Sequence, residues 1–94
     1  MEKIKILLNK VEDIQKFVTI ATYYDYDINV YKDSYIVDGK SILGLMSLDL
    51  TEPIEVAIIS NDIYNIDSFK CDIMQFEYKT KTTNLDKENS ENII

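Results

Sequence analysis

The most specific chemical group in this sequence is a serine hydroxyl at the start of an apolar segment. Ser41 follows the turn-forming residues 38–40 and precedes residues 42–48, most of which are apolar. Such a hydroxyl can cap a helix by accepting a backbone N–H, which contributes about 1 kcal/mol, and it can also accept a phosphoryl group. Capping is the expected role on general grounds, because any helix that begins at residue 42 would favour serine here.

Two residue types that carry most familiar active sites are missing. None of the 94 residues is histidine, and all ten basic residues are lysines. The absence of histidine removes the commonest general base, the commonest metal ligand and the usual phosphoramidate acceptor. The absence of arginine and a net charge of −7 argue against nucleic acid, because no guanidinium can contact phosphates or guanine edges. We expect no nucleic-acid partner, no metal and no cofactor.

The acidic residues do not form a recognisable site. The 17 Asp and Glu residues are scattered and lack the spacing of a calcium-binding loop. Asp25 and Asp27 flank Tyr26, but no partner base accompanies them, so solvated turn residues are favoured over a catalytic pair. The tyrosines of this region are expected to pack at strand and helix ends with their hydroxyls in water. These tyrosines are Tyr23, Tyr24, Tyr26, Tyr31 and Tyr35.

The apolar segments are too short for a membrane protein. The longest uncharged apolar run, residues 41–48, is far shorter than the roughly 20 residues of a membrane-spanning helix. Charged and apolar residues alternate over residues 1–5, unlike a secretory signal. Cys71 is the only cysteine, so we expect no internal disulfide and assign it to the core as a small filler. The sequence predicts a monomeric cytoplasmic protein with no membrane partner.

Hydrophobic periodicity predicts an α+β fold with the element order βαββαβα. Strands are expected at residues 2–8, around 28–31, at 35–37 and at 54–59. Helices are expected at residues 11–24, at 42–48 and from 61 or 62 to near 78. The expected arrangement is a four-stranded antiparallel sheet covered on one face by helices.

Particular residues support these assignments. Asn9 is a suitable cap for the first helix, in which six apolar residues share one face. These six are Val11, Ile14, Phe17, Val18, Ala21 and Tyr24. Residues 42–48 could form a buried strand, but leucines, a methionine and the lack of β-branching after Ile42 favour a helix. The strand at 54–59, with Pro53 before it, is expected at the centre of the sheet.

The chain divides into one domain and a tail. A chain of this size forms a single core, which we place at residues 1–78. Residues 79–94 are polar and aperiodic. They contain too few apolar groups to offset the entropic cost of ordering them, so we expect a disordered tail.

Two segments resemble the HPr phosphocarrier family. Residues 37–48, Val-Asp-Gly-Lys-Ser-Ile-Leu-Gly-Leu-Met-Ser-Leu, are similar to the family segment Lys-Ser-Ile-Met-Gly-Val-Met-Ser-Leu that follows the third strand. Residues 21–28, Ala-Thr-Tyr-Tyr-Asp-Tyr-Asp-Ile, are similar to the family's Ala-Ser-Lys-Phe-Asp-Ser-Asp-Ile at the end of the first helix. The similarity covers about residues 2–78 and implies the HPr-like open-faced sandwich.

The resemblance implies partners in the bacterial sugar phosphotransferase system. HPr proteins accept phosphate from enzyme I on a histidine and pass it to sugar-specific permease subunits, without being enzymes themselves. In many relatives the serine that matches Ser41 is phosphorylated by HPr kinase, which makes HPr a corepressor for a catabolite-control regulator. Ile42, Leu43 and Met46 match the apolar patch that relatives present to their partners, although core positions are equally plausible.

The family's histidine motif, Gly-Ile-His-Ala-Arg-Pro-Ala, is not present. Ungapped alignment places Lys10 at the histidine, Glu12 at the arginine and Asp13 at the proline. A carboxylate repels phosphate where a guanidinium would bind it. We therefore expect a regulatory or adaptor module that binds HPr partners without histidine phosphotransfer, with phosphorylation of Ser41 as a candidate switch. The alternative is a phosphocarrier with a nonstandard acceptor, Ser41 or Lys10.

Overall fold

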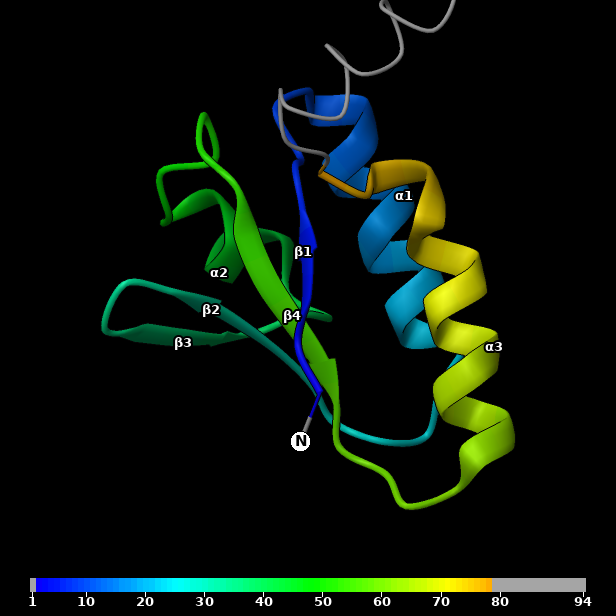
Figure 1. Ribbon diagram of the computed structural model, residues 1–94. Helices are drawn as coiled ribbons and strands as arrows, with labels where there is room; N and C mark the ends of the chain where they lie inside the picture. Colours follow the sequence, from blue (N-terminus) through cyan, green and yellow to red (C-terminus); the bar gives the residue numbers. More distant parts are fainter. Residues whose placement is uncertain (1, 79–94) are drawn as a thin grey trace, which may run out of the picture.

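A computed structural model describes residues 2–78 and shows the expected order of elements (Figure 1). The strands are β1 (Ile4–Ile6), β2 (Ile28–Lys32), β3 (Tyr35–Asp38) and β4 (Ile54–Ile58). The helices are α1 (Val11–Thr22), α2 (Ile42–Met46) and α3 (Ile63–Ile73), and the 3₁₀ turn η1 (Met74–Phe76) follows α3. The tail predicted at residues 79–94 lies outside the described residues.

The four strands form one antiparallel sheet in the order β1-β4-β2-β3. β4 is central, as predicted. Val56 of β4 lies opposite Ile4 of β1 and opposite Val30 of β2. Because side chains alternate between the two faces of a strand, these three apolar residues share one face of the sheet. That face is the one the helices must cover.

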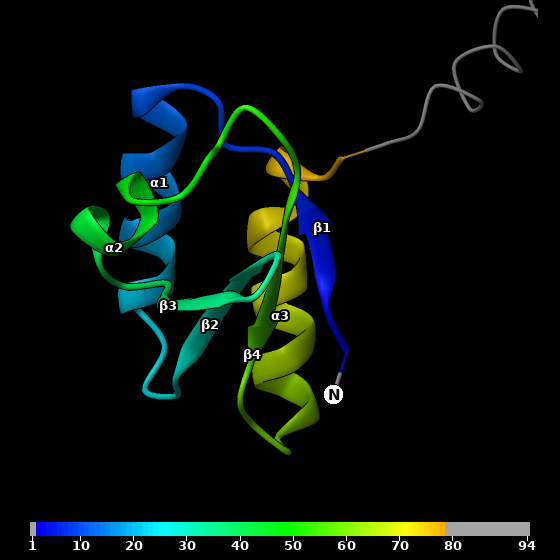
Figure 2. The same ribbon diagram turned by 90° about the vertical axis from the view of Figure 1, so that its left-hand side faces the viewer.

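The core lies between this face and the helices, which confirms the open-faced sandwich. Phe17 of α1 is fully buried and meets Phe69 and Phe76 edge to face, with ring centroids 6.5 Å and 6.3 Å apart. Such aromatic pairs contribute about 0.5–1.5 kcal/mol beyond the area that they bury. Figure 2 shows α2 beside α1, and residues of the two helices are in contact.

Several details of the helices differ from the sequence prediction. Lys10, not Asn9, is the N-cap of α1, and it makes no side-chain capping bond. Val11 is 56% exposed, because it lies to one side of the stripe through which α1 contacts the core. That buried stripe consists of Ile14, Phe17 and Ala21. Cys71, predicted in the core, is exposed because α3 turns Phe69 and Ile73 inward instead.

The two long helices also end earlier than expected. α1 ends at Thr22 instead of residue 24, since the N–H groups of Tyr23 and Tyr24 bond to carbonyls three residues back, which tightens the last turn. α3 ends at Ile73, and η1 continues the chain as a 3₁₀ turn in place of the helix predicted to residue 78.

Tyr24 joins the end of α1 to α3 and to the turn before α2. Its hydroxyl donates to the Asp72 carboxylate at 2.6 Å and lies 2.9 Å from the Ser68 hydroxyl. Its backbone carbonyl accepts a bond from the Lys40 ammonium at 2.6 Å. This hydroxyl is therefore engaged with α3, and the prediction that it lies in water is wrong. Burial, followed by the bond to Asp72, raises the pKa of Tyr24 above its ordinary value.

The substitution Tyr24→Phe is expected to lower the free energy of unfolding by about 1 kcal/mol near neutral pH, because it removes the bonds to α3. The folded-state pKa exceeds the unfolded value of about 10, so this stabilisation is complete below the unfolded pKa and is lost as pH rises through the folded pKa. Urea unfolding of the wild type and the variant at neutral and alkaline pH measures the difference in their free energies of unfolding. A difference in stability that does not shrink above about pH 10 would contradict these contacts.

Candidate functional site

Ser41 is the N-cap of α2. Its backbone is extended, with φ −111° and ψ 115°, and its hydroxyl oxygen accepts a bond from the Gly44 N–H at 3.0 Å. Its carbonyl accepts the first helical bond, from the Leu45 N–H at 3.1 Å. The predicted capping role is therefore confirmed. The residue is half-buried, so the cap lies at the protein surface.

Both glycines of the chain serve the segment around Ser41. The Gly39 N–H donates to the Ile28 carbonyl of β2 at 2.7 Å. A Cβ at residue 39 would lie 2.8 Å from Ile28 Cγ2, which is too close for two carbon atoms, so the backbone can approach β2 only as glycine. A Cβ at residue 44 would lie 3.3 Å from the Ser41 Oγ, so Gly44 leaves room for the capping hydroxyl.

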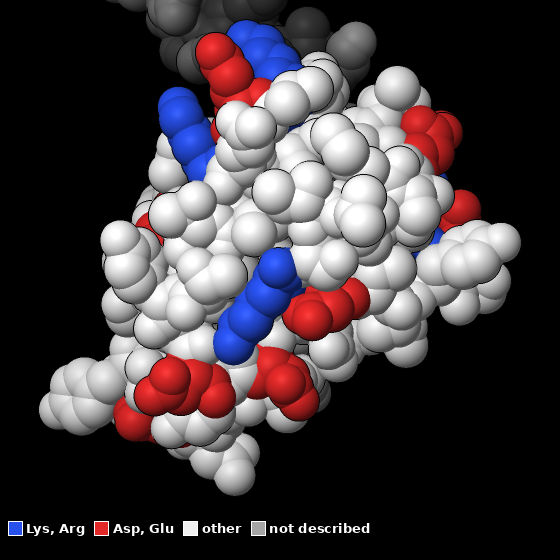
Figure 3. All heavy atoms as spheres, turned by 180° about the vertical axis from the view of Figure 1, so that it is seen from behind, with Lys and Arg blue, Asp and Glu red and all other residues white. Residues whose placement is uncertain are grey.

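α2 carries an exposed apolar patch. Leu43 is 82% exposed, Met46 48% and Ile42 40%, whereas Leu45 is fully buried. The sequence left open whether these residues belong to the core, and the structure places all three at the surface. Figure 3 shows the side of the molecule that carries α1 and α2, which is mostly uncharged, with a Lys side chain across its middle and acidic side chains near its lower end and its upper right edge. We call Ile42, Leu43 and Met46 the α2 patch.

Lys10 lies at the start of α1 and is exposed. Its carbonyl accepts bonds from the Asp13 N–H at 3.0 Å and the Ile14 N–H at 3.1 Å. Glu12 and Asp13 occupy the first turn, where carboxylates interact favourably with the helix dipole. The N-cap and the first turn of α1 thus offer one ammonium group and two carboxylates.

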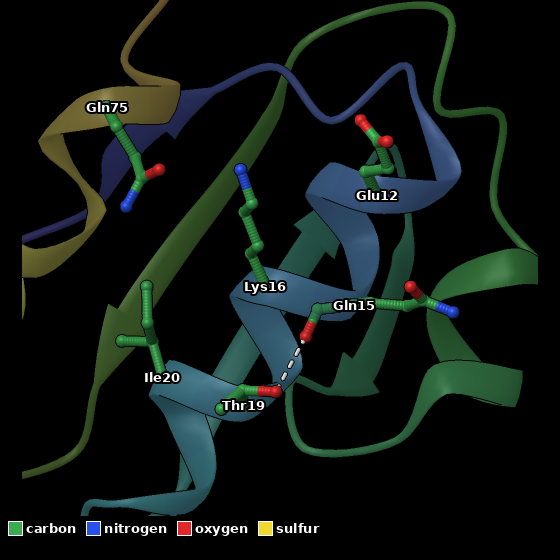
Figure 4. Close-up of a pocket in the computed structure, with 6 residues that line it drawn as sticks. All are labelled: Glu12, Gln15, Lys16, Thr19, Ile20 and Gln75. Carbon is green, nitrogen blue, oxygen red and sulfur yellow. Dashed lines mark hydrogen bonds between the residues drawn. The ribbon is translucent and has the colours of Figure 1, made fainter.

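A groove open to solvent lies along α1 and faces η1. It has a volume of about 480 Å³ and is lined by Glu12, Gln15, Lys16, Thr19, Ile20 and Gln75 (Figure 4). The Thr19 hydroxyl donates to the Gln15 carbonyl at 2.9 Å, so it is engaged within its own helix. The lining contains one lysine and one carboxylate but no nucleophile paired with a base, and so lacks a catalytic constellation.

The contacts of the remaining polar groups indicate structural roles. The Lys32 ammonium donates to Glu52 at 2.8 Å and to Asp33 at 3.3 Å. The bond to Glu52 raises the pKa of Lys32, which keeps this ammonium protonated and unsuited to act as a base. Within residues 2–78, no cluster of three or more His, Cys, Asp or Glu residues could hold a metal ion. Nor does this part of the chain contain a helix long and apolar enough to cross a membrane.

Sequence reasoning missed Lys40 as a neighbour that fixes Ser41. Its ammonium bonds to the Tyr24 carbonyl, and its N–H donates to the Asp38 carboxylate at 2.9 Å. The turn sequence at residues 38–40 predicts the second contact, because aspartate commonly accepts an N–H two residues later. The first contact joins residues sixteen positions apart and has no local signal. Lys40 thus links the capping residue to the end of α1.

Comparison with known proteins gives a family and a fold. A family model described as the PTS HPr component phosphorylation site matches residues 13–62. The match includes Ser41 and the α2 patch, whereas Lys10 lies before it. The crystal structure of HPr-C-His from Thermoanaerobacter tengcongensis is similar, with a TM-score of 0.64 and 23% identity, covering 80% of this chain and 92% of that chain. The curated proteins gave no significant match.

At 23% identity, the likeness to this crystal structure supports the fold alone. The match to the family model also supports membership of the family. This match spans more than half of the chain and includes the turn, the capping serine and α2, together with the flanking strands β2, β3 and β4. The chain therefore belongs to the HPr family, the phosphocarrier family of the phosphotransferase system.

Proposed function

We propose that this protein is a regulatory or adaptor member of the HPr family that binds HPr partners through the α2 patch without carrying phosphate on histidine. The exposure of the patch is the observation that carries the proposal. A five-residue helix that buries only Leu45 leaves its other apolar side chains in water, where they favour a docking partner. The partners are phosphotransferase-system proteins such as enzyme I and permease subunits, or a catabolite-control regulator.

The start of α1 supports the part of the proposal that excludes phosphate transfer through histidine. The family's acceptor is a histidine, and none exists among the 94 residues. Lys10 is the N-cap of α1, and Glu12 lies in the first turn, where its carboxylate repels an incoming phosphoryl group. A carrier that uses Ser41 or Lys10 as acceptor is the alternative function. It would need another source of the positive charge that an arginine supplies in relatives.

Phosphorylation of Ser41 by HPr kinase is the regulatory part of the proposal. The serine is half-buried, and its oxygen already accepts the Gly44 N–H. A phosphate retains acceptor oxygens and adds a charge of about −1.5 to −2 beside the uncharged α2 patch. The modification would therefore change the charge of the docking surface more than its shape. We place this activity in the cytoplasm, with a monomer as the working form and no cofactor.

The substitution Leu43→Ser is expected to weaken binding to enzyme I roughly tenfold, because it removes the most exposed apolar side chain of the patch. Titration by isothermal calorimetry measures the dissociation constant. Tyr64→Ser is the matched control, since Tyr64 is 83% exposed but lies on α3. Equal losses in both variants, or no loss in Leu43→Ser, would rule out α2 as the docking surface.

Incubation with ATP and HPr kinase is expected to add one phosphate, which intact-mass spectrometry detects. The phosphate should be absent from Ser41→Ala and present in Ser47→Ala, whose serine lies at the other end of α2 and is exposed. A wild-type protein that gains no phosphate would leave Ser41 with its capping role alone. A phosphate that survives in Ser41→Ala would place the modification elsewhere.

A further inference from the structure

The two edges of the sheet differ in how residues 2–78 cover them. At the β1 edge, the Leu7 N–H donates to the Phe76 carbonyl at 2.9 Å and the Tyr78 N–H donates to the Lys5 carbonyl at 3.1 Å. β3 forms the other edge and pairs with β2 alone among the described strands, on the side of the sheet away from α3 (Figure 1). An edge strand presents a row of backbone donors and acceptors that an extended segment of another chain can bind.

The register of the β2–β3 pair identifies the backbone groups that face outward. The Gly39 N–H bonds to the Ile28 carbonyl at 2.7 Å. In an antiparallel pair, positions that exchange hydrogen bonds alternate with positions that do not. The two positions on either side of Ile36 therefore bond to β2, whereas the N–H and C=O of Ile36 itself and the N–H of Asp38 point outward. These three groups can bond to an incoming strand.

The side chains of β3 offer apolar surface on both faces of the sheet. Tyr35 and Ile36 are 64% and 63% exposed, and Val37 is half-buried. Successive residues point to opposite faces, so Ile36 lies on the open face and the other two on the helix side. β3 carries no lysine or proline, the residues with which edge strands commonly resist pairing. An added strand would therefore cover apolar side chains on each of its faces.

Carboxylates stand at both ends of β3. The side chain of Asp33 is 76% exposed before the strand, and Asp38 is exposed at its end. Asp33 shares the Lys32 ammonium, at 3.3 Å, with a second carboxylate. The Lys40 ammonium is bonded to the Tyr24 carbonyl, so it is held away from the edge. Cationic residues on an incoming strand would meet complementary charge at both ends.

We propose that β3 binds an extended segment of a partner protein as a fifth strand, with a lysine or arginine opposite Asp38 and a β-branched residue opposite Ile36. Main-chain bonds supply the affinity, and the two cross-strand pairs supply the specificity. A second copy of this chain is disfavoured as the occupant, because each molecule has a net charge of −7. This binding mode is separate from docking on the α2 patch, so either can fail alone.

A synthetic peptide tests the proposal with the full chain. The probe is the acetylated and amidated hexapeptide Lys-Val-Ile-Val-Thr-Lys, whose first four residues are designed to lie opposite residues 38 to 35 in antiparallel order. Its matched control carries a methyl group on the isoleucine nitrogen, which removes the N–H that donates to the Ile36 carbonyl and changes no charge. Titration is expected to shift the amide NMR signals of residues 34–38, with a dissociation constant about tenfold or more lower for the unmethylated peptide.

A protein variant tests the charge contact separately. Asp38→Asn is expected to weaken binding of the unmethylated peptide about threefold, because it removes the charge but keeps an oxygen for the Lys40 N–H. Asp67→Asn is the matched control, since Asp67 is exposed but lies on α3, and it should bind like the wild type. Equal affinities of the two variants would remove Asp38 from the site.

Four further outcomes would overturn the proposal. The first is the absence of any shift at about 1 mM peptide. The second is equal affinity for the methylated and unmethylated peptides. The third is a set of shifted signals confined to α2 or α3. The fourth is a change in the β3 signals with protein concentration when no peptide is present, which would make a second copy the occupant.

Discussion

Phe17 meets Phe69 and Phe76 over the buried side of the central strands, and this aromatic contact holds α1 and α3 on one face of the sheet. Tyr24 extends the same row of aromatic rings, and its ring centroid lies 5.3 Å from that of Phe69. The two long helices therefore bury their apolar stripes against each other and the sheet. α2 contributes Leu45 alone to this layer, which is why its remaining apolar residues face outward.

The position of the candidate site follows from close contacts at the edge of this layer. Gly39 passes directly over Ile28, and Lys40 bonds to the carbonyl of Tyr24. The turn before α2 is thus tied both to β2 and to the end of α1. These ties fix Ser41, so a phosphate added there would act on a rigid surface and change its charge.

Much of the fold could be predicted from the sequence, because apolar spacing specifies strands and helices locally. The central place of β4 and the capping role of Ser41 are examples. The exposure of Cys71 and Val11 could not be predicted, since helical spacing alone does not say which side of a broad apolar stripe meets the sheet. The contact of Lys40 with Tyr24 depends on how the chain folds back, which no local pattern contains.

The central claim is that this HPr-family protein binds the partners of the family without accepting phosphate from enzyme I. Mixing the purified protein with phosphorylated enzyme I, followed by measurement of complex formation and of the intact mass, tests it most directly. The account predicts a complex and an unchanged mass. A gain of one phosphate would contradict it, and loss of that phosphate in Lys10→Ala or Ser41→Ala would identify the acceptor that makes the protein a carrier.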